Sequence, residues 1–267
     1  MTQSHFFRPA DFSRGGLTLL RSGGGNARIV RVMISLRRLI PAAALAFAFT
    51  AGTSCDRKPD VPQVDVYNIE GNVAWVDGRY ADALAAYQKA LALTDKDKDP
   101  KEWARIASDV AKMHGKLAAW KEAETLLIEV LRLREQYDGA KSVKTAENLD
   151  QLAKVLMGTG RHKEAEPLLR RVLAIDEGNG GKDTAVVALR LKDLAQLLQE
   201  MNRLDEAEPL MRQAVEIYAG VILKTRSKPV YLETLPDNYR DLRMKMGDTK
   251  AEAQEKIDKL LKPIRKK

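Results

Sequence analysis

The chain is poor in the residues from which catalytic and metal sites are built. It has one cysteine, Cys55, and three histidines among 267 residues. A single cysteine excludes an intrachain disulfide. No His-x-x-x-His motif, Cys-x-x-Cys motif or phosphate-binding glycine loop occurs after residue 60. We therefore expect no enzyme activity, no cofactor, no metal and no small-molecule substrate.

An excess of positive charge is also lacking outside the N-terminal region. The net charge of the whole chain is +8. Residues 1–55 contain seven arginines and one acidic residue, whereas residues 56–267 carry 38 basic and 36 acidic side chains. A nearly neutral region lacks the basic stripe that a phosphate backbone requires. The charge balance therefore argues against nucleic acid as a partner.

Long apolar runs are absent except for one that extends from Leu39 to Ala51. This run follows Arg37 and Arg38 and precedes small residues, an order typical of a secretory signal peptide. It is shorter than the ~20 apolar residues that a membrane-spanning helix needs. We predict a signal peptide over residues 33–55. Residues 1–32 are predicted to be a disordered leader, with Met33 as an alternative start of translation.

Cys55 lies at the end of this signal-like segment. Its position after Ser54 resembles the lipobox of bacterial lipoproteins, although Gly52 replaces the usual leucine. The resemblance implies cleavage before Cys55, lipidation of this residue and anchoring in the cell envelope, facing the periplasm or the exterior. Asp56 resembles a signal for retention in the inner membrane. The alternative is an ordinary signal-peptidase site with an incidental cysteine. Residues 56–64, with two prolines, are predicted to be a short stiff tether.

After residue 64 the sequence repeats with a fixed period, marked by alanines at intervals of 40, 42 and 42 residues. The marker alanines are Ala83, Ala123, Ala165 and Ala207. A small residue stands twelve positions before each marker, and a large one stands four positions after it. The small residues are Gly71, Ala111, Ala153 and Ala195; the large ones are Tyr87, Leu127, Leu169 and Met211. These spacings predict closely packed helix pairs, the first at 65–76 and 80–93.

The pattern resembles the tetratricopeptide repeat (TPR). Its period and the Glu-Ala-Glu-Pro-Leu phrases at 164–168 and 206–210 are similar to the kinesin-light-chain-type subgroup. The resemblance implies an all-α fold, a superhelical solenoid of antiparallel helix pairs. We predict four repeats over 65–218 and an atypical capping pair with a basic tail over 219–267. Within this cap, residues 219–235 are expected to be an extended connection.

Two further features receive structural interpretations. His5 lies in the leader, whereas His114 and His162 occupy repeat positions that packing residues usually fill. We expect these histidines to pack rather than to catalyse or bind metal. Glutamate pairs near the start of each second helix, such as Glu164 and Glu166, are interpreted as favourable charges near a helix N-terminus.

The resemblance also implies a binding surface on the inner face, built from exposed positions of the first helix in each pair. The candidates are Asn68, Asn72 and Trp75; Arg105, Ser108 and Lys112; Asp150, Lys154 and Met157; and Lys192, Gln196 and Gln199. This mixture of amide and charged groups suits an extended or acidic peptide. The carboxylate clamp of TPR chaperone adaptors is absent, because only Asn72 matches its residue set.

The sequence therefore predicts a non-enzymatic, membrane-anchored scaffold that binds a protein or peptide outside the cytoplasm. One alternative is an assembly factor of an envelope machine, similar to a pilotin. The other is a cytoplasmic adaptor, which applies if residues 1–55 are not an export signal.

Overall fold

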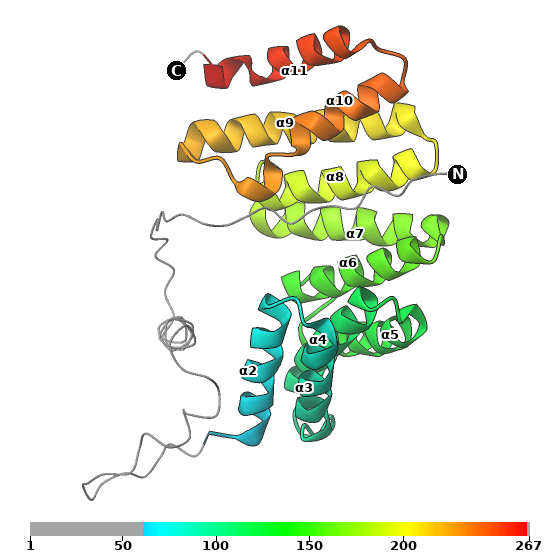
Figure 1. The fold of residues 1–267 in the computed structure, drawn as a ribbon, viewed down its shortest axis with the longest axis vertical. Helices are drawn as coiled ribbons and strands as arrows, with labels where there is room; N and C mark the ends of the chain where they lie inside the picture. Colours follow the sequence, from blue (N-terminus) through cyan, green and yellow to red (C-terminus); the bar gives the residue numbers. More distant parts are fainter. Residues whose placement is uncertain (1–60, 266–267) are drawn as a thin grey trace, which may run out of the picture. The chain divides into compact units, whose positions relative to one another are not determined.

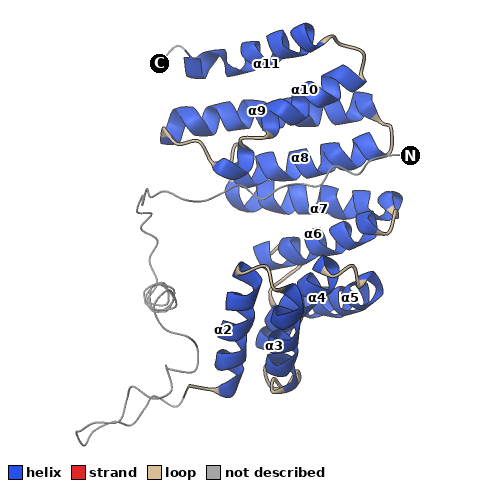
Figure 2. Cartoon of the chain, viewed as in Figure 1, coloured by secondary structure: helices blue, strands red, loops and turns tan. Residues whose placement is uncertain are grey.

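The structure is a computed structural model that describes residues 61–265. The predicted leader, the signal peptide, Cys55, Asp56 and the first part of the tether lie outside the described residues. The described residues form helices and no strands (Figure 2). The helices are α2 (Gln63–Val76), α3 (Tyr80–Ala92), α4 (Pro100–Lys116), α5 (Trp120–Tyr137), α6 (Val143–Gly158), α7 (His162–Gly180), α8 (Ala185–Glu200), α9 (Leu204–Thr225), the 3₁₀ helix η1 (Val230–Leu232), α10 (Leu235–Lys245) and α11 (Lys250–Arg265). None of these helices has both the length and the apolar composition needed to cross a membrane.

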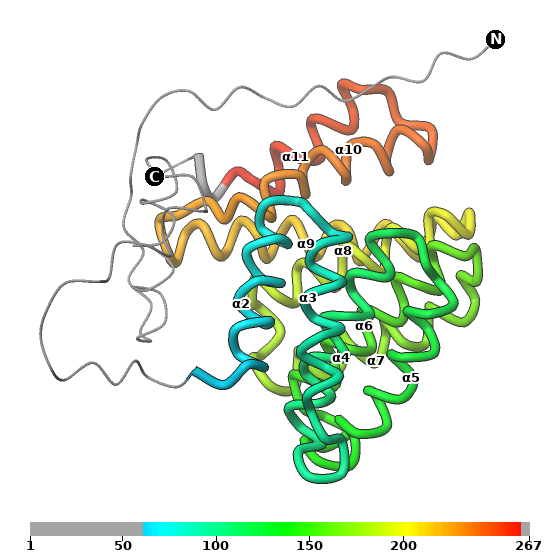
Figure 3. The backbone as a smooth tube through the Cα atoms, turned by 60° about the horizontal axis from the view of Figure 1, so that its bottom comes forward, coloured from blue at the N-terminus to red at the C-terminus, as the bar shows by residue number. Residues whose placement is uncertain are grey.

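Successive helices are antiparallel and stack as pairs (Figure 1). Helices α2, α4, α6 and α8 are termed helices A, and their successors α3, α5, α7 and α9 are termed helices B. Each helix B packs on its own helix A and on helix A of the next pair. Figure 3 shows the same stacking from another direction, with α10 and α11 beside α9. The predicted solenoid of helix pairs is thereby confirmed.

The repeated small and large residues form the core of the stack. All four marker alanines are completely buried, and so are Ala111, Ala153 and Ala195 in helices A. The large residues four positions after each marker are buried as well. In the first pair, a Cβ atom added to Gly71 would lie 2.5 Å from the ring of Tyr87. The small residue therefore permits the close approach of helices A and B, as the spacing predicts.

The turns between helices A and B repeat one backbone conformation. Gly78, Ala118, Gly160 and Asn202 have φ angles of 74°, 58°, 75° and 59°. The N–H of the next residue bonds back to the carbonyl five residues earlier, for example from Arg161 to Leu156 at 2.8 Å. This bond closes the end of each helix A in a Schellman-type motif. Ala118 adopts the left-handed conformation that favours glycine, although it lacks glycine's freedom.

Replacing Ala118 by glycine is expected to raise the free energy of unfolding by about 1 kcal/mol, because the left-handed strain of alanine disappears. The matched control is Gly160→Ala in the next repeat. No atom lies within 4 Å of a Cβ built on Gly160, so its expected loss of about 1 kcal/mol comes from backbone strain alone. Urea unfolding followed by circular dichroism measures both changes. If both variants changed the free energy of unfolding in the same direction, the left-handed strain assigned to Ala118 would be contradicted.

The C-terminal part differs from the expected extended connection over 219–235. Helix α9 continues to Thr225, because the buried residues Ala219 and Ile222 extend its apolar face. Only residues 226–229 and 233–234 are non-helical. Helices α10 and α11 then form the predicted capping pair against α9. Hydrogen bonds from Arg243 and Lys256 hold the pKa of Asp248, which lies between the two capping helices, at about 2.

Candidate functional site

The twelve predicted contact residues all lie on helices A, and nine of them are exposed or half-buried. The other three, Asn68, Ser108 and Asp150, are buried. These three share one register position in the first three repeats. Their expected exposure is therefore wrong, because this position faces the neighbouring pair and not solvent.

Two of the buried residues form polar bridges to the next helix A. Asn148 of α6 donates its side-chain N–H to the hydroxyl of Ser108 in α4 at 2.7 Å. In the same register one repeat later, Arg190 of α8 contacts Asp150 of α6 at 3.1 Å. Arg190 also donates from Nε to Asp176 of α7 at 2.8 Å. Burial opposes the charge of Arg190, but the carboxylates of Asp150 and Asp176 raise its pKa above the ordinary value.

The third buried residue, Asn68, has no such bridge. Its side-chain N and O atoms are both buried without a hydrogen-bond partner among the described residues. The register places Ile106 opposite Asn68, where Asn148 and Arg190 stand opposite Ser108 and Asp150. An isoleucine side chain cannot donate or accept a hydrogen bond, so the first junction lacks the polar bridge.

Asn68→Leu is expected to raise the free energy of unfolding by about 1–2 kcal/mol, because it removes a buried amide that lacks partners. The matched control is Ser108→Val at the same register position. This change leaves the buried amide of Asn148 unpaired, and we expect a loss of about 1–2 kcal/mol. Thermal unfolding followed by circular dichroism compares the two variants. A destabilising Asn68→Leu would show that this amide has a partner that the structure does not contain.

The surface formed by the exposed and half-buried candidate residues of α2, α4, α6 and α8 is termed the helix-A face. At its N-terminal end, candidate residues from α2 and α4 come together. Lys112 Nζ lies 4.0 Å from the ring centroid of Trp75, within the range of a cation–π contact. Trp75 is 39% exposed. Asn72 accepts a 2.8 Å hydrogen bond from the hydroxyl of Tyr87. Burial raises the pKa of Tyr87 to about 12, so its hydroxyl stays a donor at neutral pH. The indole of Trp75 and the ammonium of Lys112 thus form one surface that a partner can contact.

Several charged candidates are paired with acids on their own helix. Arg105 bonds Glu102 at 2.6 Å, Lys154 bonds Asp150 at 2.7 Å, and Lys192 contacts Asp193 at 3.2 Å. Each pair leaves part of the cation exposed. Met157 on α6 is half-buried. The middle of the helix-A face therefore presents partly neutralised cations and not a strong positive field.

At the other end of the face, α8 and α10 enclose a polar pocket of about 390 Å³. Lys245 of α10 lies 3.3 Å from Gln199 Oε1 of α8. The pocket residues are Gln196, Gln199, Glu200, Asn238, Asp241 and Lys245. Their amide groups supply donors and acceptors together, as a peptide backbone requires. The predicted residues Gln196 and Gln199 are thus joined by α10 residues that the sequence analysis did not select.

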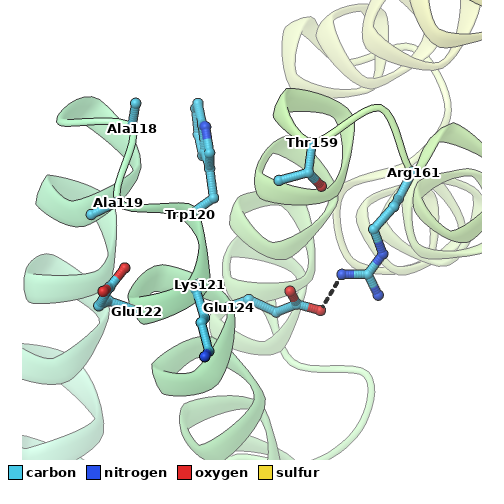
Figure 4. A pocket seen from close by; sticks show the side chains of 8 residues that line it. All are labelled: Ala118, Ala119, Trp120, Lys121, Glu122, Glu124, Thr159 and Arg161. Carbon is cyan, nitrogen blue, oxygen red and sulfur yellow. Dashed lines mark hydrogen bonds and ion pairs between the residues drawn. The ribbon is translucent and has the colours of Figure 1, made fainter.

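Ion pairs at the turns between helices A and B are a second feature that the sequence analysis missed. Arg161 donates to Glu124 of the preceding helix B at 2.6 Å (Figure 4). It also donates to Glu164 of its own helix pair. Arg203 repeats this arrangement with Glu166 and Glu206. Glu124 and Glu166 are therefore bridges between repeats, in addition to lying near a helix N-terminus. The signal in the sequence is a spacing of 37 residues between glutamate and arginine, which occurs twice.

In the second repeat, Ala119 occupies the position that Arg161 and Arg203 hold in the later repeats. Its small side chain borders a shallow pocket of about 500 Å³ (Figure 4). Trp120 stands beside the pocket and packs over Gly158 of the next repeat, 2.9 Å from a Cβ built there. Since this tryptophan is half-buried and in contact with the next pair, we assign it to repeat stacking.

The histidines lie where packing residues were expected. His162 is half-buried and its Nε2 is 3.1 Å from Glu200 Oε2 of the next repeat. His114 is half-buried, and its Nδ1 has no partner among the described residues. In the part of the chain that the structure describes, no group of His, Cys, Asp and Glu side chains could hold a metal ion.

The family comparison agrees with this geometry. The family described as tetratricopeptide repeat matches residues 104–178 and 145–219. Residues 104–219 therefore match tetratricopeptide repeats, and the fold of the described residues is that of a TPR solenoid. Such repeats are generally non-catalytic scaffolds. No curated protein sequence matches the chain significantly.

Solved structures with a similar fold include several TPR proteins. BtubC (BKLC) from P. vanneervenii is 19% identical, with a TM-score of 0.65 over 90% of this chain and 89% of that chain. A structure described as Podosopora anserina kinesin light chain with nearly identical TPR-like repeats is 17% identical, with a TM-score of 0.59 over 77% and 96% of the two chains. The apo form of RapI is 13% identical, with a TM-score of 0.60 over 76% and 72%. At these identities the similarity shows the fold alone.

Proposed function

We propose that this protein is a non-enzymatic scaffold that holds an extended peptide or protein segment on its helix-A face. The observation that carries the proposal is the polar pocket between α8 and α10, where amide side chains from a helix A and from the first capping helix converge. The exposed Trp75 with Lys112 supplies a second contact at the other end of the face. An aromatic anchor combined with amide donors and acceptors suits a segment that runs across several helices A.

The test compares two pairs of charge reversals in a bait of residues 60–267, incubated with envelope extract. Lys112→Glu with Lys154→Glu alters the helix-A face, whereas Lys121→Glu with Lys163→Glu makes the same charge change on exposed positions of helices B. We expect the helix-A variant to recover its partner at least tenfold less well than the wild type, and the helix-B variant to recover it normally. Equal recovery by both variants would overturn the helix-A assignment.

We also propose that Cys55 anchors the protein in the cell envelope. The support comes from the sequence: a basic start, an apolar run and a lone cysteine after small residues. The expected result is incorporation of a palmitate analogue into the full-length wild type in cells, and none into Cys55→Ser. Labelling that survives this substitution would end the lipoprotein proposal. Absence of label together with a cytosolic location would favour the cytoplasmic adaptor. If deletion of the protein prevents assembly of an envelope machine, the pilotin-like assembly factor would be favoured.

A further inference from the structure

The segment that joins α9 to η1 differs from the loops that join each helix B to the next helix A. Lys224, Arg226 and Lys228 are all exposed, and none of them forms an ion pair with another described residue. Glu233 is the one acidic residue in the segment 224–233. The segment therefore presents an unneutralised positive surface, unlike the paired cations of the helix-A face.

The same segment exposes two apolar side chains in a fixed position. Val230 is 78% exposed and Tyr231 is 57% exposed, whereas Leu232 of the same 3₁₀ helix is completely buried. Burial of Leu232 against the core fixes η1, so Val230 and Tyr231 are held outward. The preceding turn is also ordered, because the N–H of Arg226 bonds the Ile222 carbonyl at 2.8 Å and the N–H of Ser227 bonds Thr225 Oγ1 at 3.2 Å.

We propose that the segment 224–231 docks on an anionic lipid surface. Cations beside an exposed tyrosine and valine match the two components of interfacial binding, which are attraction to acidic headgroups and shallow insertion of apolar groups. The docked segment would fix how the helix-A face is oriented relative to the membrane.

The inference depends on the proposed envelope location in one respect, which is that the protein must lie near a membrane. Its test uses residues 60–267, which form a compact unit of their own and lack Cys55, so the result does not depend on lipidation. The unit is sedimented with phosphatidylcholine vesicles that contain or lack phosphatidylglycerol. We expect binding to the anionic vesicles alone. A basic residue at such a surface contributes about fivefold to partitioning. Loss of three cations in Lys224→Glu/Arg226→Glu/Lys228→Glu should therefore lower partitioning by at least about 100-fold, because the three new carboxylates are also repelled.

The matched control is Lys101→Glu/Lys121→Glu/Lys163→Glu, which changes the net charge equally at scattered exposed positions and should retain most binding. High salt screens the attraction between the cations and the headgroups, so the binding that remains comes from the apolar side chains. Val230→Ser/Tyr231→Ser should lose this remaining binding. The proposal is overturned if the unit ignores anionic vesicles or if the scattered control loses as much binding as the loop variant. It is also overturned if the unit binds polyglutamate but not vesicles, which would identify an acidic polypeptide as the occupant.

Discussion

Replacing Arg190 by leucine is expected to lower the free energy of unfolding by about 3–5 kcal/mol, because two buried carboxylates lose their shared cation. Asp150 of α6 and Asp176 of α7 both contact Arg190 of α8, and all three side chains are largely buried. In a stack of repeats, each pair is stabilised mainly by its neighbours. The loss should therefore be concentrated in α6, α7 and α8, where hydrogen exchange would report it alongside urea unfolding.

A rescue variant separates the loss of the ion pair from a general packing defect. Adding Asp150→Asn and Asp176→Asn to Arg190→Leu removes the charge of Asp176 and that of Asp150, which would keep only the half-exposed Lys154 as a partner. We expect recovery of more than half of the lost stability. Arg161→Leu is the matched control. Its ion pairs with Glu124 and Glu164 are solvent-exposed in part, so we expect a change within about 1 kcal/mol. The interpretation fails if Arg190→Leu is no more harmful than Arg161→Leu.

The helix pairs could be predicted because the residues that pack within a pair are close in sequence and repeat. Ala165 and Leu169, for example, lie one turn apart on α7, and the same step occurs in each helix B. The end of α9 could not be predicted from the repeat. Ala219 and Ile222 continue the apolar spacing of that helix beyond Tyr218, but they have no counterpart in the repeat, so the period gave no indication of them.

The burial of the polar helix-A position could not be predicted from one repeat alone. Ser108 and Asp150 look like solvent-facing residues within their own helices, but each is covered by a polar side chain about 40 residues later. The pocket between α8 and α10 was missed because the repeat pattern fades before Asn238 and Asp241. Contacts between repeats depend on two positions at once, and a single helix pattern reports only one of them.

Gly71→Ala is expected to lower the free energy of unfolding by about 2 kcal/mol, although alanine is the better helix former. The added Cβ would lie 2.5 Å from the ring of Tyr87, and the ring itself is buried. Tyr87→Leu alone is expected to lower it by about 2–3 kcal/mol, because it leaves a cavity beside Gly71 and removes the hydrogen bond to Asn72.

The two substitutions together should restore stability to within about 1 kcal/mol of the wild type, which corresponds to a coupling energy of about 3 kcal/mol. The chain supplies the reason, since the second and third pairs already combine alanine with leucine at these two positions. Urea unfolding of all four proteins measures the coupling. Tyr87→Leu with Ala153→Gly is the control; those residues belong to different repeats, so their effects should add. If Gly71→Ala and Tyr87→Leu were also additive, the glycine would not be set by the tyrosine ring, and the close approach of α2 and α3 would need another cause.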